Sequence, residues 1–215
     1  MTTLRVCVVG DSLVLGTNDD EYLGWPGRLA HREARAGHDI SLYNLGIRAD
    51  TSEMIAARWR AECEARLPEI HPGALVFSFG VNDMAIQDGE IRVPQERSLE
   101  IARAMMTKAR DWKATLWIGP QPIADDKQPF RAGGGIEYYF AGDRTAALSD
   151  AYGELAGELG IPYLDLFTPL AATAEWDRMF GPGDGVHPIA AGYGMIAERI
   201  TGWDAWRVWF DEDPD

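Results

Sequence analysis

The sequence predicts a three-layer α/β/α sandwich around a central parallel sheet with a flavodoxin-like strand order. Short apolar runs alternate with longer amphipathic stretches along the 215 residues, as strands and helices do in such folds. The runs are continuously apolar, which is typical of strands that are covered on both faces. Glycine and proline stand near the positions where the helices should begin and end.

The elements are expected in regular alternation. Five strands are expected at residues 4–9, 40–44, 74–79, 114–118 and 162–165. Five helices are expected at about 25–36, 52–66, 95–112, 143–159 and 189–201. Pro94 and Pro188 are expected at first helical positions, and Gly37 and Gly160 at helix ends.

Two segments interrupt this alternation. Residues 119–142 are too rich in proline and glycine for regular structure, and they follow the fourth strand, so we expect a functional loop over the carboxyl edge of the sheet. The C-terminal segment carries aromatic residues at helical spacing: Trp203, Trp206, Trp209 and Phe210. We interpret them as a packing stripe, which a homodimer contact could also use. A single domain is expected over 1–210, with 211–215 as a frayed acidic tail.

Composition argues against several classes of function. With 20 basic and 34 acidic residues the net charge is −14, so no basic face for nucleic acid is expected. No apolar stretch is long enough for membrane insertion, and the first strand begins too early for a signal peptide, which favours a cytoplasmic protein. Cys7 and Cys63 are expected to be buried, without a disulfide framework. No loop has metal-ligand spacing, so neither a metal nor a cofactor is expected.

Candidate catalytic residues follow the expected strands. Ser12 comes directly after the first strand, Asn82 follows the third, and Asp184 and His187 stand just before the last helix. Residues at the carboxyl ends of parallel strands converge on one crevice. Ester cleavage needs a nucleophile, a base, an acid that orients the base, and donors for the oxyanion. The chain offers a candidate for each role.

The spacing of Asp184 and His187 is weak evidence alone. With 34 acids in 215 residues, an acid three positions before one of four histidines is nearly expected by chance. The context is more informative, because Gly185 lets the loop turn and Pro188 should begin a helix, fixing His187 at its entrance. His31, His38 and His71 lack such a setting.

Four short blocks of this chain contain the candidate residues: Gly10-Asp11-Ser12-Leu13, Asn44 through Thr51, Gly80-Val81-Asn82-Asp83 and Asp184-Gly185-Val186-His187-Pro188. In sequence and in order, these blocks resemble the four blocks of the SGNH (GDSL-type) esterases and lipases. The resemblance implies the SGNH hydrolase fold. It also implies Ser12 as nucleophile, His187 as base and then acid, and Asp184 as the group that orients His187. The oxyanion would be bound by the Ser12 backbone N–H, a backbone N–H of the second block and the Asn82 amide.

The second block departs from the family pattern. Many members have a glycine directly before the Asp-Thr pair, where this chain has Ala49. A backbone N–H is what the chemistry needs, so alanine can serve there if its φ is negative. We expect Ala49 to be the donor, with Gly46 as the fallback. Asp11 and Asp83 are expected to cap or brace their turns, and Arg48 to be solvated.

The resemblance implies a carboxylic ester hydrolase, but not its substrate. Short-chain esters, thioesters, lysophospholipids and acetylated sugars all remain open; a small soluble acyl ester is our first choice. Residues 119–142, with Phe130, Arg131, Tyr138 and Tyr139, are the expected specificity wall. The alternative is a non-catalytic module that binds a small molecule or nucleotide at the strand ends. Against it, no nucleotide-binding glycine motif is present.

Overall fold

The central sheet is parallel and has the strand order β2-β1-β3-β6-β9 in a computed structural model that describes residues 2–181 and 183–210. In chain order the strands are β1 (Thr3–Gly10), β2 (Asp39–Gly46), β3 (Gly73–Ser78), β6 (Ala114–Ile118) and β9 (Tyr163–Leu164). This is the flavodoxin-like order, so the predicted fold class is confirmed. Gly10 pairs with both Gly46 and Ser78, which brings the carboxyl ends of the three strands to one edge.

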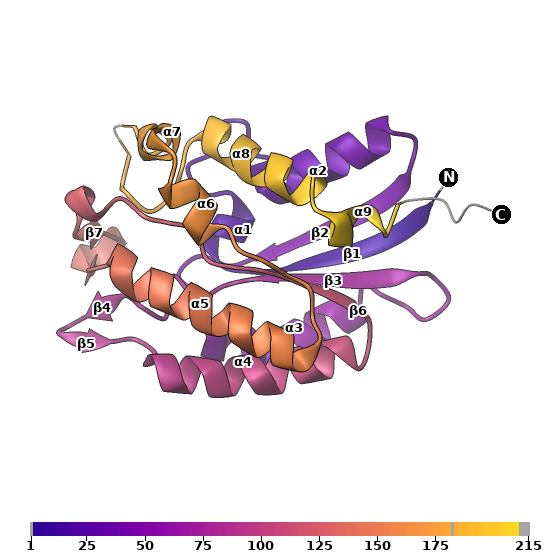
Figure 1. The fold of residues 1–215 in the computed structure, drawn as a ribbon, viewed down its shortest axis with the longest axis horizontal. Coiled ribbons are helices and arrows are strands. Elements are labelled where there is room, and N and C mark those ends of the chain that lie inside the picture. The colour runs from indigo at the N-terminus through magenta and orange to yellow at the C-terminus, as the bar shows by residue number, and fades with distance from the viewer. Residues whose placement is uncertain (1, 182, 211–215) are drawn as a thin grey trace.

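Helices cover both faces of the sheet, as Figure 1 shows. Alternate residues of β1 point to opposite faces. Val6 and Val8 belong to a core with α2 (Gly24–Arg35) and α8 (Ala190–Thr201). Cys7 and Val9 belong to a second core with α3 (Ser52–Glu64), α4 (Gln95–Arg110) and α5 (Gly142–Leu159). Because β1 is buried on both sides from Val6 to Val9, that stretch is apolar without interruption.

The five expected helices are present, with ends close to those predicted. Gly160 caps α5 in the left-handed conformation, at φ 64°, as its position after the helix predicted. Pro94 and Pro188 were expected to be the first residues of helices, and neither is. Pro94 is the N-cap of α4 rather than its first residue, and Pro188 precedes Ile189, the N-cap of α8.

Several short elements escaped prediction, and most lie at the carboxyl edge of the sheet, on the left of Figure 1. They include the hairpin β4 (Ile86–Gln87) with β5 (Glu90–Ile91), and the helices α1 (Ser12–Leu15), α6 (Phe167–Ala171), α7 (Ala174–Arg178) and α9 (Asp204–Arg207). We expected no regular structure in the 119–142 segment, but it contains short regular elements. It contains the 3₁₀ turns η1 (Asp125–Lys127) and η2 (Gly133–Gly135) and the hairpin β7 (Phe130–Arg131) with β8 (Glu137–Tyr138). Paired backbone hydrogen bonds between Ile86 and Tyr139 join the two hairpins.

The C-terminal aromatic stripe packs into this chain. Trp206 and Phe210 are buried in the same core as α2 and α8. The indole N–H of Trp206 donates to the buried carboxylate of Glu33 over 3.0 Å. The acidic tail at 211–215 lies outside the described residues.

Cys7 and Cys63 are free and buried. A hydrogen bond with Cys7, together with burial, raises the pKa of the Cys63 thiol far above its ordinary value. In the part of the chain that the structure describes, no helix combines the length and apolar character that a membrane crossing requires.

Candidate active site

Ser12 lies at the sharp turn between the end of β1 and the start of α1. Gly10 allows this turn, because a Cβ there would lie 2.1 Å from the carbonyl oxygen of Ser78. The Asp11 side chain caps the helix by accepting from the Leu13 backbone N–H over 2.9 Å. Ser12 is thereby held at the carboxyl edge of the sheet, with 5% of its surface exposed.

A continuous chain of hydrogen bonds links Ser12, His187 and Asp184. Nε2 of His187 lies 2.8 Å from Oγ of Ser12, and Nδ1 lies 2.7 Å from Oδ2 of Asp184. Oδ2 of a carboxylate can only accept, so Nδ1 carries the hydrogen and Nε2 is free to accept the serine hydroxyl. The three residues that the sequence suggested from distant positions are therefore brought together.

The loop that carries Asp184 and His187 is fixed from several sides. Oδ1 of Asp184 accepts from the backbone N–H groups of Val186 and His187 at 2.9 and 2.8 Å. Gly185 has φ 81°, and its carbonyl accepts from the Ala124 N–H over 2.7 Å. A Cβ at Gly185 would lie 2.6 Å from the side chain of Lys127, so glycine is required by both conformation and space.

Asp184 is held in its charged form. Burial alone would raise the pKa of its carboxyl group, but the hydrogen bond and charge of His187 and the two backbone N–H groups outweigh it. The net pKa of Asp184 is therefore below its ordinary value. A charged carboxylate beside Nδ1 can stabilise an imidazolium that forms when Nε2 takes up a proton.

Asn82 follows the end of β3 and lies at the same cavity as Ser12 and His187. It lines the cavity beside Ser12, and its side-chain amide donates to Oδ2 of Asp11 over 3.0 Å. The amide has a second hydrogen, which this bond leaves available. Asp11 thus braces its own turn, as expected, and also orients Asn82.

Asp83 caps a different element from the one expected. Its Oδ1 accepts from the backbone N–H of Ser52 over 2.7 Å, at the start of α3, rather than capping the connection after β3. Its Oδ2 accepts from the hydroxyl of Ser98. Burial raises the pKa of Asp83 despite these bonds. Asp83 therefore ties the Asn82 loop to the helix that follows the second block.

Ala49 lies at the cavity, but its backbone differs from the expectation. Its φ is 64°, in the left-handed region, whereas we expected a negative φ. A hydrogen bond from the Asp50 N–H to the Ile47 carbonyl closes a turn with Ala49 in its third position. Such a type II turn needs a positive φ there, which explains why glycine is usual at this position.

Gly46, the fallback donor, has another role. It pairs with Gly10 within the sheet, and its N–H donates to the side-chain oxygen of Asn44 over 3.0 Å. A Cβ at Gly46 would lie 2.3 Å from the Leu15 backbone nitrogen, so glycine lets α1 pack closely on β2. Ala49, and not Gly46, is among the residues that line the cavity.

Two arginines that the sequence did not single out brace these loops. Arg58 of α3 donates to the Gly10 carbonyl over 2.8 Å and to the Asp50 carboxylate over 2.7 Å. Arg92, just after β5, donates to the Ala49 carbonyl over 2.8 Å. No sequence motif marks either arginine, because each donates to a backbone carbonyl more than 40 positions away in the chain.

The cavity at Ser12 has a volume of about 420 Å³. Three aromatic rings of the 119–142 segment line it: Phe130, Tyr138 and Phe140. The Phe130 ring centroid lies 5.7 Å from that of His187, edge to face. We expected residues of this segment to line the site, and Phe130, Arg131 and Tyr138 do line the cavity. Tyr139 is 46% exposed and does not line the cavity; Phe140 does.

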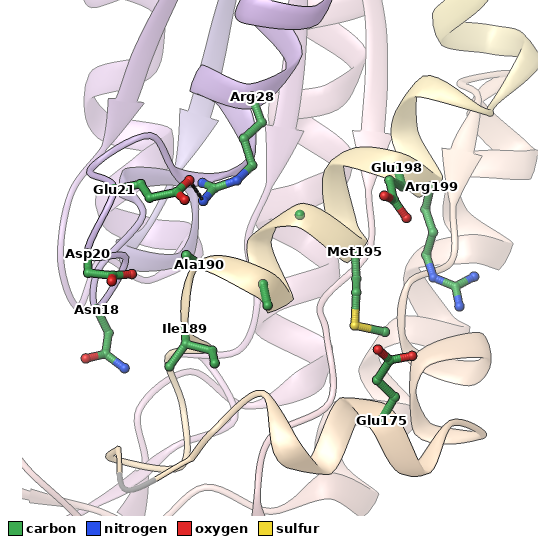
Figure 2. A pocket seen from close by; sticks show the side chains of 12 residues that line it. Asn18, Asp20, Glu21, Arg28, Glu175, Ile189, Ala190, Met195, Glu198 and Arg199 are labelled. Atoms are coloured by element: carbon green, nitrogen blue, oxygen red, sulfur yellow. Dashed lines mark hydrogen bonds and ion pairs between the residues drawn. The ribbon is translucent and has the colours of Figure 1, made fainter.

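A larger cavity, of about 1060 Å³, lies over α8 and the loop before α2 and contains none of these residues. Figure 2 shows that Arg28 is paired with Glu21 on one side of it, while Glu175, Glu198 and Arg199 stand on the other. It is an open hollow lined by both charged and apolar side chains, with no group of reactive side chains among the residues that line it. Among residues 2–181 and 183–210, no three His, Cys, Asp or Glu side chains are grouped to hold a metal ion.

Comparison with known families agrees with this geometry. The model of the GDSL-like lipase/acylhydrolase family matches residues 8–195. The chain belongs to the GDSL-like lipase/acylhydrolase family. This family membership supports an ester hydrolase function. The comparison with curated proteins found no match.

Solved structures with the GDSL hydrolase fold superpose on nearly the whole chain. A lipase/acylhydrolase from Enterococcus faecalis is 21% identical, with TM-score 0.74 over 96% of this chain and 97% of its own. TesA is 23% identical, with TM-score 0.71 over 96% and 99%. The esterase EstA from Pseudoalteromonas sp., inhibited by monoethylphosphonate, is 16% identical, with TM-score 0.69 over 97% and 99%. At these identities the likeness shows a shared fold.

Proposed function

We propose that this GDSL-family protein hydrolyses small, water-soluble carboxylic esters or thioesters through an acyl-enzyme on Ser12. The observation that carries the proposal is the chain of hydrogen bonds from Ser12 through His187 to Asp184, 2.8 and 2.7 Å long, between three residues that line one cavity. A binding module would have no use for a serine hydroxyl aligned on a histidine that a carboxylate orients.

In the acylation half of the reaction, Oγ of Ser12 attacks the ester carbonyl carbon while Nε2 of His187 takes the hydroxyl proton. The carbonyl oxygen becomes an oxyanion, bound by the N–H groups of Ser12 and Ala49 and by the free amide hydrogen of Asn82. The tetrahedral intermediate then breaks its bond to the leaving oxygen or sulfur. His187 returns the proton to that atom, and the alcohol or thiol departs.

In the deacylation half, a water molecule replaces the alcohol beside His187. Nε2 removes a proton as the water oxygen attacks the acyl carbon, and the same donors bind the second oxyanion. Collapse of this intermediate releases the acid, and the proton on His187 returns to Oγ of Ser12. Asp184 stays ionised throughout and stabilises the imidazolium.

The cavity favours a short acyl chain. About 420 Å³ lies near the lower end of the range for small-molecule sites. Phe130, Tyr138 and Phe140 close it with aromatic surface that suits an apolar acyl group. We expect kcat/KM to be highest for acetyl to butyryl esters and to fall for long-chain ones.

Labelling with a fluorophosphonate probe tests the nucleophile. Wild type should be labelled on Ser12 and should cleave p-nitrophenyl acetate, whereas Ser12→Ala should do neither. Ser41→Ala, which removes an exposed hydroxyl on β2, is the matched control and should behave as wild type. An unlabelled, inactive wild type would overturn the proposal in favour of the non-catalytic binding module.

A further inference from the structure

The turn that contains Ala49 is strained. The Ile47–Asp50 turn is closed by a 3.3 Å hydrogen bond, and Ala49 holds φ 64° without being glycine. For an alanine, contact between Cβ and the backbone disfavours this region. Some other interaction must therefore keep the turn in this conformation.

Ala49 can leave the strained region in two ways. The Arg48–Ala49 peptide can flip, which converts a type II turn into a type I turn and points the N–H away. Alternatively, the Ala49 carbonyl can swing round, and because β2 and α3 anchor the chain on the two sides of the turn, the Arg48–Ala49 peptide and its N–H must shift with it. The second movement would break the 2.8 Å hydrogen bond that Nη2 of Arg92 donates to this carbonyl.

Arg92 is itself rigidly placed. Its backbone N–H donates to the Ala85 carbonyl over 2.9 Å, which ties it to the segment that follows Asn82. Its guanidinium lies over the ring of Tyr138, 5.1 Å from the centroid, and is half-buried. Nη1 is buried and has no hydrogen-bond partner among the described residues. Arg92 does not line the Ser12 cavity, so it acts through the groups that it holds.

We propose that Arg92 is a positioning residue of the oxyanion site, which fixes the strained Ala49 turn against the Asn82 segment and the Tyr138 wall. The inference rests on the proposed function, because it assigns the Ala49 N–H to the oxyanion. Three segments from distant parts of the chain therefore meet at this one residue: its guanidinium contacts Ala49 and Tyr138, and its backbone N–H contacts Ala85. An oxyanion donor acts in the transition state, so its misplacement lowers kcat more than it raises KM.

Steady-state kinetics of Arg92→Met and Arg92→Lys on p-nitrophenyl acetate test the proposal. Loss of a whole donor lowers turnover by about 10²–10³, so we expect Arg92→Met to lower kcat by about 10-fold or more, with KM within about twofold. Arg92→Lys should recover part of the loss, since an ammonium can still donate to the carbonyl. Arg144→Met is the matched control, because Arg144 also donates to two backbone carbonyls nearby, of Met84 and Tyr139. It should keep the wild-type kcat.

Arg92→Met in an Ala49→Gly background tests whether Arg92 holds the Ala49 turn or only packs against Tyr138. Glycine adopts a positive φ without strain, so Arg92→Met should then lower kcat by less than about threefold. An equal loss in both backgrounds would overturn the proposal, as would a raised KM with unchanged kcat, which would place Arg92 in the aromatic wall alone. The melting temperature of every variant shows whether it is folded under the conditions of the assay. Inactive, unlabelled wild type would refute the proposed function, whereas active wild type with fully active Arg92→Met would refute this inference only.

Discussion

The side-chain amide of Asn82 donates to the carboxylate of Asp11 over 3.0 Å, and both residues are buried. Asp11 follows β1 and Asn82 follows the neighbouring strand β3, so the bond joins two strand ends. The other oxygen of the same carboxylate caps the helix that begins with Ser12. One carboxylate therefore sets the relative position of the proposed nucleophile and of a proposed oxyanion donor.

Replacement of Asp11 by asparagine should lower activity although the shape is nearly unchanged. The new amide offers one accepting oxygen for two donors, so its NH₂ must face either the Leu13 N–H or the Asn82 amide. We expect Asp11→Asn to lower kcat by about 10-fold or more, within the range for loss of one oxyanion donor. Asp20→Asn, at an exposed position, is the control. If Asp11 acts through Asn82, Asp11→Asn should add little to the loss caused by Asn82→Ala; full additivity would contradict this.

Asp11 should also make stability depend on pH. Burial raises the pKa of its carboxyl group from 3.8 to about 6, although the Leu13 N–H, the charge of His187 and the Asn82 amide oppose the shift. Between these two values the folded protein binds more protons than the unfolded chain. The free energy of unfolding therefore decreases as the pH rises through this window, by on the order of 3 kcal/mol for this group.

Urea unfolding of wild type and Asp11→Asn at pH 4 and pH 7 measures this contribution. Asparagine does not titrate, so the stability of wild type relative to the variant should fall between the two pH values. Other groups, including Asp184 with its lowered pKa, titrate in both proteins and cancel in the difference. A difference that stays constant would show that folding leaves the pKa of Asp11 unchanged.

Asp184→Asn should abolish most of the activity. The asparagine NH₂ would face Nδ1 of His187, so the ring hydrogen would move to Nε2, which then could not accept the Ser12 proton. We expect kcat to fall by about 10³–10⁴, with KM little changed. Asp177→Asn, exposed on α7, should have no effect. Retention of more than a tenth of wild-type kcat would remove Asp184 from the proposed triad.

Ala49→Gly should stabilise the protein. Glycine relieves the strain at φ 64°, and we expect the free energy of unfolding to rise by about 1 kcal/mol with kcat at least as high as in wild type. Ala36→Gly is the matched control, because Ala36 has φ −75° and gains nothing from glycine. Equal changes at the two positions in thermal or urea unfolding would contradict the strain at Ala49.

The sheet, its strand order and the five long helices could be predicted because each long element carries its own pattern. Val6 to Val9 are apolar without a break since each face of β1 meets a layer of helices. The two-residue strands β4, β5, β7 and β8 are too short to show any periodicity. They form because neighbouring loops pair with one another, as Ile86 does with Tyr139.

The positions of Ser12, Asn82, Asp184 and His187 could likewise be inferred from strand ends and family blocks. The conformation of Ala49 could not, because alanine gives no signal for a positive φ. That conformation depends on the turn around it and on Arg92, which lies 43 positions further along the chain. Local sequence thus indicated the side chains that are proposed to react, while long-range contacts determine the backbone conformation beside them.

The aromatic wall of the cavity comes from one continuous stretch of chain, whereas the groups proposed for bond breaking come from four others. Exchanges at the cavity-lining residues of this stretch, such as Phe130 and Phe140, can therefore alter which acyl groups fit while the groups proposed for bond breaking stay unchanged. Natural or directed evolution can therefore change which acyl groups fit without changing the residues proposed for the chemistry.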